Sequence, residues 1–103
     1  MRLCLAAFIL ALALAGSALA DAAAGKALYM TKCKGCHGPD GSGNPAIAKM
    51  LSVTLKPLGS KEVQAKSDDQ LKKDTTAGTG KMKPVKLTDA EASDVVAFVR
   101  TLK

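Results

Sequence analysis

The sequence has few aromatic side chains, with no tryptophan, one tyrosine and two phenylalanines among 103 residues. Beyond position 20 the aromatic residues are Tyr29 and Phe98 alone. A chain of this length forms one small domain, and such a domain usually needs a staple, a metal or a cofactor in addition to its side chains. We therefore expect something other than side chains to fill the centre of the fold.

Histidine and cysteine are also scarce, which limits the metal chemistry that the chain can support. His37 is the only histidine, and the cysteines are Cys4, Cys33 and Cys36. A structural zinc site needs four ligands, whereas the chain beyond position 20 offers three such residues, all close together in sequence. A structural zinc site is therefore not expected.

The first part of the chain has the three parts of a secretory signal peptide. Arg2 precedes an uncharged apolar run, Leu3–Ala15, and small residues follow, with Ala18 and Ala20 at the positions that a signal peptidase reads. The apolar run is too short to span a bilayer, which needs about 20 apolar residues; an uncleaved anchor is the alternative. The sequence predicts a cleaved signal peptide at 1–20, one domain at 21–103 and a periplasmic protein with no membrane span after cleavage.

Helical patterns account for most of the remaining chain. Asp21 is expected to cap a first helix that runs to Cys33. Ser67 is expected to cap a second helix that ends near Ala77, and Thr88 is expected to cap a third. The two later starts have capping-box spacing. The third helix also carries an apolar stripe at helical spacing, formed by Ala92, Val95, Val96, Val99 and Leu102. These patterns predict an all-α fold with long loops.

Two further local features complete this prediction. A short helix is expected at 46–51, with Ile47, Met50 and Leu51 turned inward. Arg100 and Lys103 are expected to lie favourably at the negative end of the dipole of their helix.

Residues 33–37, Cys-Lys-Gly-Cys-His, have the spacing of a covalent haem-attachment site. Two thiols one helical turn apart reach the two vinyl groups on one edge of the porphyrin, and His37 then projects beneath the ring to ligate the iron. A thioredoxin-type redox pair shares the Cys-x-x-Cys spacing, but no alternation of strands and helices surrounds it here. A structural disulfide would close a very small loop and stabilise little. We therefore predict one covalent haem c attached through Cys33 and Cys36 and ligated by His37.

The second axial ligand of the iron must come from another residue type, because the chain has no second histidine. Methionine suits an electron carrier, since it raises the reduction potential. Met30 lies on the attachment helix and cannot reach the opposite face of the ring, and Met50 lies on an apolar face where methionine more often fills a core. Met82 lies in an irregular glycine-rich loop, 78–84, far enough along the chain to come over the ring. Met82 is the predicted ligand, with Met50 or an open site as alternatives.

With these residues the chain resembles the class I c-type cytochromes over nearly all of its length beyond the signal. In that family a glycine and an aromatic residue of the first helix cross the last helix at close range; Gly25 and Tyr29 match the first pair, and Val95 and Phe98 are candidates for the second. Pro45 resembles the family proline whose carbonyl accepts a hydrogen bond from the haem-ligating histidine. The resemblance implies a small cytochrome c fold, three to four helices wrapped around one covalent haem, and single-electron transfer without enzymatic activity.

The chain departs from the family pattern at two places. Lys83 stands between Met82 and Pro84, whereas the family usually has proline directly after the ligating methionine. Asp74 and Thr75 fall where branched aliphatic residues are common, which predicts a more hydrated second helix and easier entry of water to the distal side.

The chain has a net charge of +6, and its basic residues are not evenly spread. Lysines flank the attachment motif and the predicted methionine ligand, at positions 32, 34, 81, 83 and 86. Such a ring steers docking to acidic surfaces of redox partner proteins. Nucleic acid is not expected, because no aromatic residues are interleaved with the basic ones. The sequence thus predicts a monomeric periplasmic electron carrier; the alternatives are an open-site haem ligand binder or small peroxidase, and a subunit of a larger dehydrogenase or oxidase.

Overall fold

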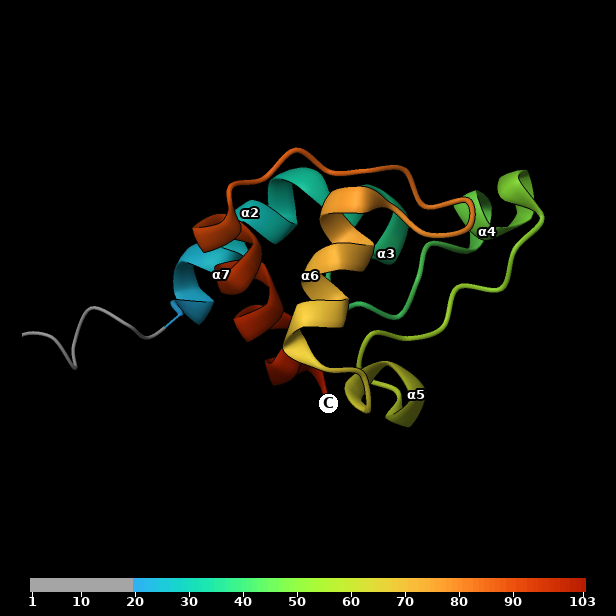
Figure 1. Cartoon of the computed structure of the whole chain (residues 1–103). Coiled ribbons are helices and arrows are strands. Elements are labelled where there is room, and N and C mark those ends of the chain that lie inside the picture. Colours follow the sequence, from blue (N-terminus) through green and yellow to red (C-terminus); the bar gives the residue numbers. More distant parts are fainter. Residues whose placement is uncertain (1–19) are drawn as a thin grey trace, which may run out of the picture.

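The computed structural model describes residues 20–103, and their regular secondary structure is entirely helical. The helices are α2 (Ala22–Lys32), α3 (Lys34–His37), α4 (Pro45–Leu51), α5 (Lys61–Gln64), α6 (Asp68–Ala77) and α7 (Asp89–Val99), followed by a 3-10 turn, Arg100–Leu102 (Figure 1). The predicted all-α fold is confirmed. Within 20–103 no helix is long and apolar enough to cross a membrane. The predicted signal peptide, apart from Ala20, lies outside the described residues.

The three main helices begin where their capping residues predict. The Asp21 side chain accepts hydrogen bonds from the first turn of α2, and α7 has a complete capping box between Thr88 and Glu91. At α6 only half of the predicted box forms: the Ser67 hydroxyl accepts from the backbone N–H of Gln70, but the Gln70 side chain bonds to Asp74 instead. A cap satisfies backbone N–H groups that the helix itself leaves without partners, so these short-range signals fix the helix starts.

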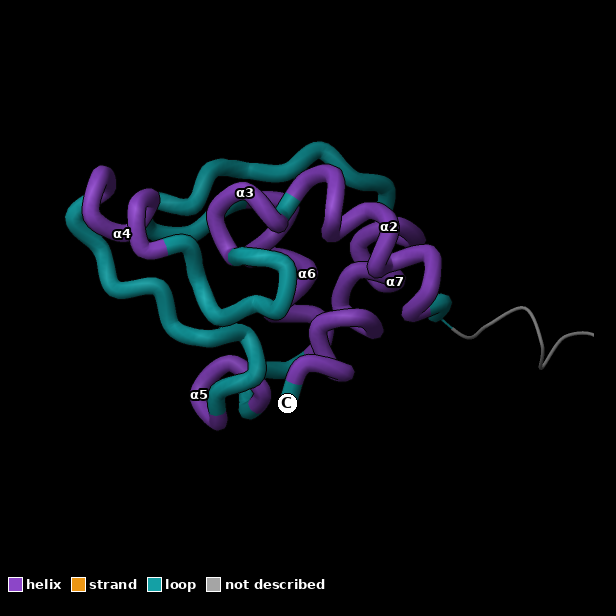
Figure 2. Tube along the Cα trace, turned by 180° about the vertical axis from the view of Figure 1, so that it is seen from behind, coloured by secondary structure: helices purple, strands orange, loops and turns teal. Residues whose placement is uncertain are grey.

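Helices α2 and α7 cross at close range and form the structural base of the fold (Figure 2). Gly25 lies against the backbone of Asp94; a Cβ at Gly25 would lie 1.8 Å from the Asp94 carbonyl oxygen. One turn further along α2, the rings of Tyr29 and Phe98 meet with their centroids 5.0 Å apart. The predicted glycine–aromatic crossing is confirmed.

The core is small and lies around this crossing. Tyr29 is completely buried. The predicted stripe of α7 is also buried, except for the half-buried Leu102, and Leu71 is the buried residue of α6. The remaining elements, α4 and the loops on either side of it, extend away from the crossing (Figure 1). The helical base therefore holds one end of the molecule, while longer loops enclose the space on the other side.

One local prediction was wrong. Met50 was expected to face inward but is 70% exposed. Ile47 and Leu51 lie four residues apart and share the inward face of α4, which leaves Met50 beside that face. Arg100 lies at the C-terminal end of α7, as predicted; its guanidinium donates to the backbone carbonyls of Gln64 and Lys66, at the end of α5 and just beyond it, and pairs with Asp68.

Candidate functional site

The predicted haem-attachment motif spans the break between α2 and α3. Cys33 ends α2, and Cys36 and His37 lie in the single turn of α3. The Cys33 side chain is buried and the Cys36 side chain is exposed, and both are free thiols. Burial raises the pKa of the Cys33 thiol. The motif thus presents one thiol on the inner side and one at the surface, both available for thioether bonds.

The loop that follows the motif fixes its backbone. The carbonyl groups of residues 35–38 all accept hydrogen bonds, two from Asn44 and one each from the Gly43 N–H and the Tyr29 hydroxyl, at 2.6–3.1 Å. Buried polar groups that lack partners are costly, so four satisfied carbonyls in a row hold the α3 turn firmly. Because Tyr29 also packs on Phe98, the helix crossing and the motif form one connected unit.

His37 is half-buried, and burial lowers the pKa of its imidazole. The neutral ring is the form that ligates metals. Its Nδ1 atom is buried and has no hydrogen-bond partner among residues 20–103. The predicted hydrogen bond to the Pro45 carbonyl is therefore not present in this structure: Pro45 is the first residue of α4, so its carbonyl belongs to the hydrogen-bond ladder of that helix. A haem-binding role for Pro45 stays a prediction.

The loop that carries Met82 is a tight reversal of the chain. Thr79 and Met82 exchange two backbone hydrogen bonds of 3.1 and 2.9 Å. Of the two residues between them, Gly80 has a positive φ of 55° and Lys81 does not, the pattern of a type II′ turn. Gly78, before the turn, also has a positive φ, and a Cβ there would lie 2.7 Å from the Met82 carbonyl oxygen. Glycine at both positions lets the loop double back and present Met82.

A lysine bond connects this turn to α4. The Lys81 ammonium donates to the backbone carbonyl of Leu51 at 2.6 Å. Leu51 is the last residue of α4, so the bond satisfies one of the carbonyls that a helix end leaves without a partner. The Met82 loop and α4 are thereby joined, and residues of both line one space.

That space consists of two cavities, which share His37, Met82, Cys33 and Thr79 in their linings. The outer cavity has a volume of about 410 Å³ and the inner one about 140 Å³. The outer lining is largely apolar, with Ile47, Leu51, Val53, Leu55, Pro84 and Val85 among its residues. The structure therefore brings together four of the predicted site residues, because Cys36 also lines the outer cavity.

The residues present fit a haem. An apolar lining, two free thiols, an imidazole whose pKa is lowered by burial and a thioether side chain are the groups that a flat, apolar, iron-bearing ring requires. They do not fit the rival metal site, because residues 20–103 contain no group of three His, Cys, Asp or Glu side chains placed to hold a metal ion.

Three features of the site were not anticipated: the Tyr29 hydroxyl on the Gly38 carbonyl, the two hydrogen bonds from Asn44 to the motif, and the Lys81 bond to α4. Asn44 also caps α4 by accepting from the Ala46 N–H. The Asn-Pro pair at positions 44 and 45 was a signal for that cap, whereas nothing local to Tyr29 indicated its hydroxyl contact.

Comparisons with known proteins agree with this geometry. The family model described as "Cytochrome c" matches residues 22–103. The chain is 34% identical over 89 residues to cytochrome c-554(547) of Halothiobacillus neapolitanus, which covers 81% of this chain and 98% of that protein. Among solved structures it is similar to the KustC0563 c-type cytochrome, with a TM-score of 0.67 and 32% identity over 77% of this chain and 96% of the other. The chain therefore belongs to the cytochrome c family and is an electron-carrying haem protein with covalently bound haem c.

Proposed function

We propose that this protein is a periplasmic single-electron carrier whose one haem c is ligated by His37 and Met82, and that it shuttles electrons between redox partner proteins. The observation that carries the proposal is the shared lining of the two cavities. His37, from α3, and Met82, from the loop after α6, both border the outer and the inner cavity. A ring placed between these two side chains would have one on each face.

Each residue has a separate task in this assignment. Cys33 and Cys36 hold the ring covalently, and the haem, when bound, supplies an iron that gains and loses one electron. His37 stays neutral because its surroundings disfavour the charged ring. The Met82 thioether raises the reduction potential. The hydrogen-bonded turn at 79–82 keeps Met82 in place.

Replacing the proposed methionine ligand tests the assignment. Met82→Ala should keep the covalent haem, measured by the mass of the protein, but lose the long-wavelength absorption band of methionine-ligated ferric haem and bind carbon monoxide or cyanide rapidly. Met50→Ala is the matched control, since Met50 is exposed and lines neither cavity. A wild-type protein that lacks the band and binds these ligands rapidly would instead favour the open-site alternative.

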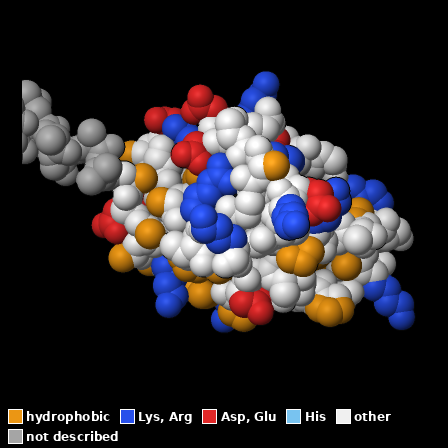
Figure 3. All heavy atoms as spheres, turned by 90° about the horizontal axis from the view of Figure 1, so that it is seen from below, with side chains coloured by type: hydrophobic (Ala, Val, Ile, Leu, Met, Phe, Trp, Pro, Cys, Tyr) orange, Lys and Arg blue, Asp and Glu red, His pale blue; other side chains and the backbone are white. Residues whose placement is uncertain are grey.

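Lysines at the mouth of the outer cavity support docking to an acidic partner surface. Lys32, Lys81 and Lys83 line that cavity, and a basic rim attracts an acidic patch and speeds encounter. Basic side chains also occupy other parts of the surface, as the view from below shows (Figure 3). Electron transfer with an acidic partner should therefore slow as ionic strength rises, and Lys83→Gln should weaken this dependence more than Lys61→Gln on α5. Equal effects of the two variants would argue against a localised docking site.

The proposed location rests on the signal-peptide pattern of residues 1–20. Cell fractionation with mass spectrometry of the purified protein tests it: the protein should be recovered from the periplasm with Asp21 as its first residue. A protein that keeps residues 1–20 would support the anchor alternative. Elution as a monomer in size-exclusion chromatography would favour the free carrier over a subunit of a larger enzyme.

A further inference from the structure

The inner cavity has an ion pair in its wall, and we propose that this pair shifts the reduction potential of the haem, with Asp74 favouring the ferric state and Lys66 opposing it. The proposal deepens the function proposed above and rests on a haem in these cavities. It does not depend on which residue is the second axial ligand.

The pair lies in the wall of the inner cavity, close to the site. Asp74 on α6 and Lys66, just before that helix, both line the inner cavity that His37 and Met82 also border. The Lys66 ammonium lies 2.9 Å from one Asp74 carboxylate oxygen, and the Gln70 amide donates to the other oxygen at 2.7 Å. The Asp74 side chain is 15% exposed, whereas that of Lys66 is 46% exposed. The carboxylate therefore faces the interior more than its cation does.

The hydrogen bond from Lys66 lowers the pKa of Asp74, with a smaller contribution from Gln70, so the carboxylate is ionised at neutral pH. Lys73 of the same helix adds a weaker attraction. Asp74 is the acidic residue in the lining of the inner cavity. Lys66, His37 and Cys33, which can also carry a charge, belong to the same lining.

The difference in exposure decides the sign of the effect. When the iron gives up one electron to a partner, the ferric haem carries one more positive charge than the ferrous haem. A negative charge that is mostly shielded from water stabilises that added charge, and the more exposed ammonium is screened more strongly by water. The net effect of the pair is therefore to stabilise the ferric state, by less than Asp74 would do alone.

The test is potentiometric titration of the purified holoprotein, which compares the wild type with Asp74→Asn, Lys66→Gln and the double variant. Asp74→Asn should shift the oxidation equilibrium toward ferrous haem at least threefold, and Lys66→Gln should shift it toward ferric haem. The double variant should lie between the two. Asp69→Asn, on the same helix but lining neither cavity, is the charge control and should shift the equilibrium less than Asp74→Asn.

Opposite signs for the two single variants would distinguish a charge effect from a loosened fold, which would move both variants in one direction. Shifts in the same direction, or an Asp74→Asn shift no larger than the Asp69→Asn shift, would overturn the proposal. The ferric absorption spectrum of the same samples reports methionine ligation. A failure of the Met82 assignment and a failure of the Asp74 assignment are therefore seen separately.

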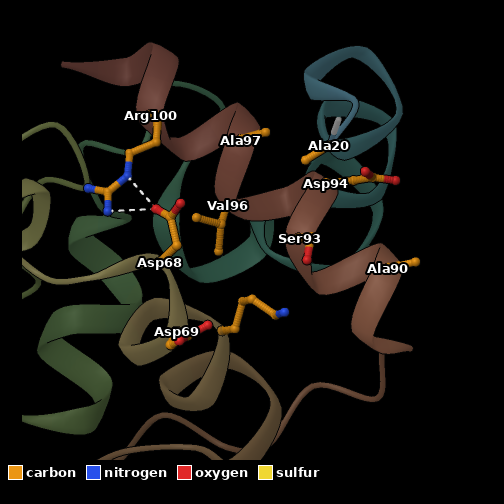
Figure 4. Close-up of a pocket in the computed structure, with 10 residues that line it drawn as sticks. Ala20, Asp68, Asp69, Ala90, Ser93, Asp94, Val96, Ala97 and Arg100 are labelled. Carbon is orange, nitrogen blue, oxygen red and sulfur yellow. Dashed lines mark hydrogen bonds and ion pairs between the residues drawn. The ribbon is translucent and has the colours of Figure 1, made fainter. Parts of the chain in front are cut away.

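A second and independent observation concerns the predicted cleavage point. The backbone nitrogen of Asp21 donates to the Asp94 carboxylate at 2.8 Å. We infer that cleavage after Ala20 turns this nitrogen into a charged ammonium and so converts the bond into an ion pair that joins the start of α2 to α7. Ala20 and Asp94 lie next to each other in the groove between α6 and α7, which is also lined by Asp69 and Ser93 (Figure 4).

The inference rests on the proposed signal cleavage, and mass spectrometry of the N-terminus checks that step separately. Insertion of one alanine between Ala20 and Asp21 moves the ammonium away and leaves a neutral amide at Asp21. Asp94→Asn should then raise the equilibrium constant for unfolding about two- to fivefold more in the protein with the native terminus than in the extended one, the range of an exposed ion pair. Asp69→Asn, in the same groove, should reduce the stability of the native and the extended protein by the same amount. An equal cost of Asp94→Asn in the two forms would overturn the inference.

Discussion

Replacement of Gly25 by alanine tests whether the α2–α7 crossing governs the stability of the fold. In an isolated helix this change would be favourable by about 1 kcal/mol, because alanine has a higher helix propensity than glycine. In this protein the new Cβ would lie 1.8 Å from the Asp94 carbonyl oxygen, 2.4 Å from its carbonyl carbon and 2.9 Å from the Val95 nitrogen. All three are backbone atoms, which no change of rotamer can move away.

The size of the effect follows from this geometry. Ordinary contact begins at 3.4 Å, so the two helices must separate by about 1.6 Å at this point. A gap of half that size already removes a quarter to a half of the dispersion energy between atoms in contact, and Tyr29 and Phe98 lie one turn away. Overpacking of this severity costs roughly 3 kcal/mol or more. After the propensity gain, about 2 kcal/mol of net destabilisation remains, and this lowers Tm by about 8–16 °C for a domain of this size.

The assay is thermal unfolding of the holoprotein, followed by circular dichroism. Gly35→Ala is the matched control: Gly35 also lies in a helix, next to the motif cysteine, but a Cβ there would meet nothing within 4 Å. It should leave Tm unchanged or slightly higher. If Gly25→Ala proves as stable as the wild type, the close approach of the two backbones does not hold the fold together and the reasoning fails.

Three further variants test individual contacts. Tyr29→Phe removes the hydroxyl from the Gly38 carbonyl and should cost about 1–3 kcal/mol in chemical denaturation. Burial raises the pKa of Tyr29 to about 12, so the wild type should lose stability as pH rises from 10 to 12, and the phenylalanine variant should not lose it. Asn44→Ala removes a helix cap and a bond to the motif and should cost about 1–2 kcal/mol; a smaller loss would mean that the loop holds α3 without it. The pKa of Glu91 is lowered by its capping bonds to Thr88. The stability that these bonds give to the folded protein is therefore present above about pH 4.5 and lost as pH falls. Glu91→Gln should flatten the acid limb of the stability curve, and an unchanged limb would exclude the capping box as its cause.

Local signals predicted the helical frame well. The Thr88 and Glu91 spacing defined the start of α7, because a capping box involves atoms only three residues apart. Gly25 and Tyr29 were assigned to the crossing on family resemblance, and the structure places both there. The prediction that Met50 faces inward was wrong because the short α4 turns only one narrow face inward. Periodicity over so few residues does not fix which face that is.

The contacts that complete the site depend on the path of the loops. The hydrogen bond from Tyr29 to Gly38 spans nine residues, and the bond from Lys81 to Leu51 spans 30. Neither follows from propensity or spacing, because both depend on how two loops fold back on the helical base. The structure also explains the presence of the polar residue Asp74 on α6. Its carboxylate binds Lys66 and Gln70 and does not depend on water alone.

The crossing of α2 and α7 also determines the order in which this protein can be completed during its synthesis. Asp21 and Asp94, which it joins, are 73 positions apart, so the contact closes a long loop and forms only after the intervening chain has been made. Until then Tyr29 has no Phe98 to pack against, and the inner cavity lacks its α7 wall. Helix α7 is therefore the last element that the chain supplies to the inner cavity, after both thiols of the motif, His37 and Met82 have been made.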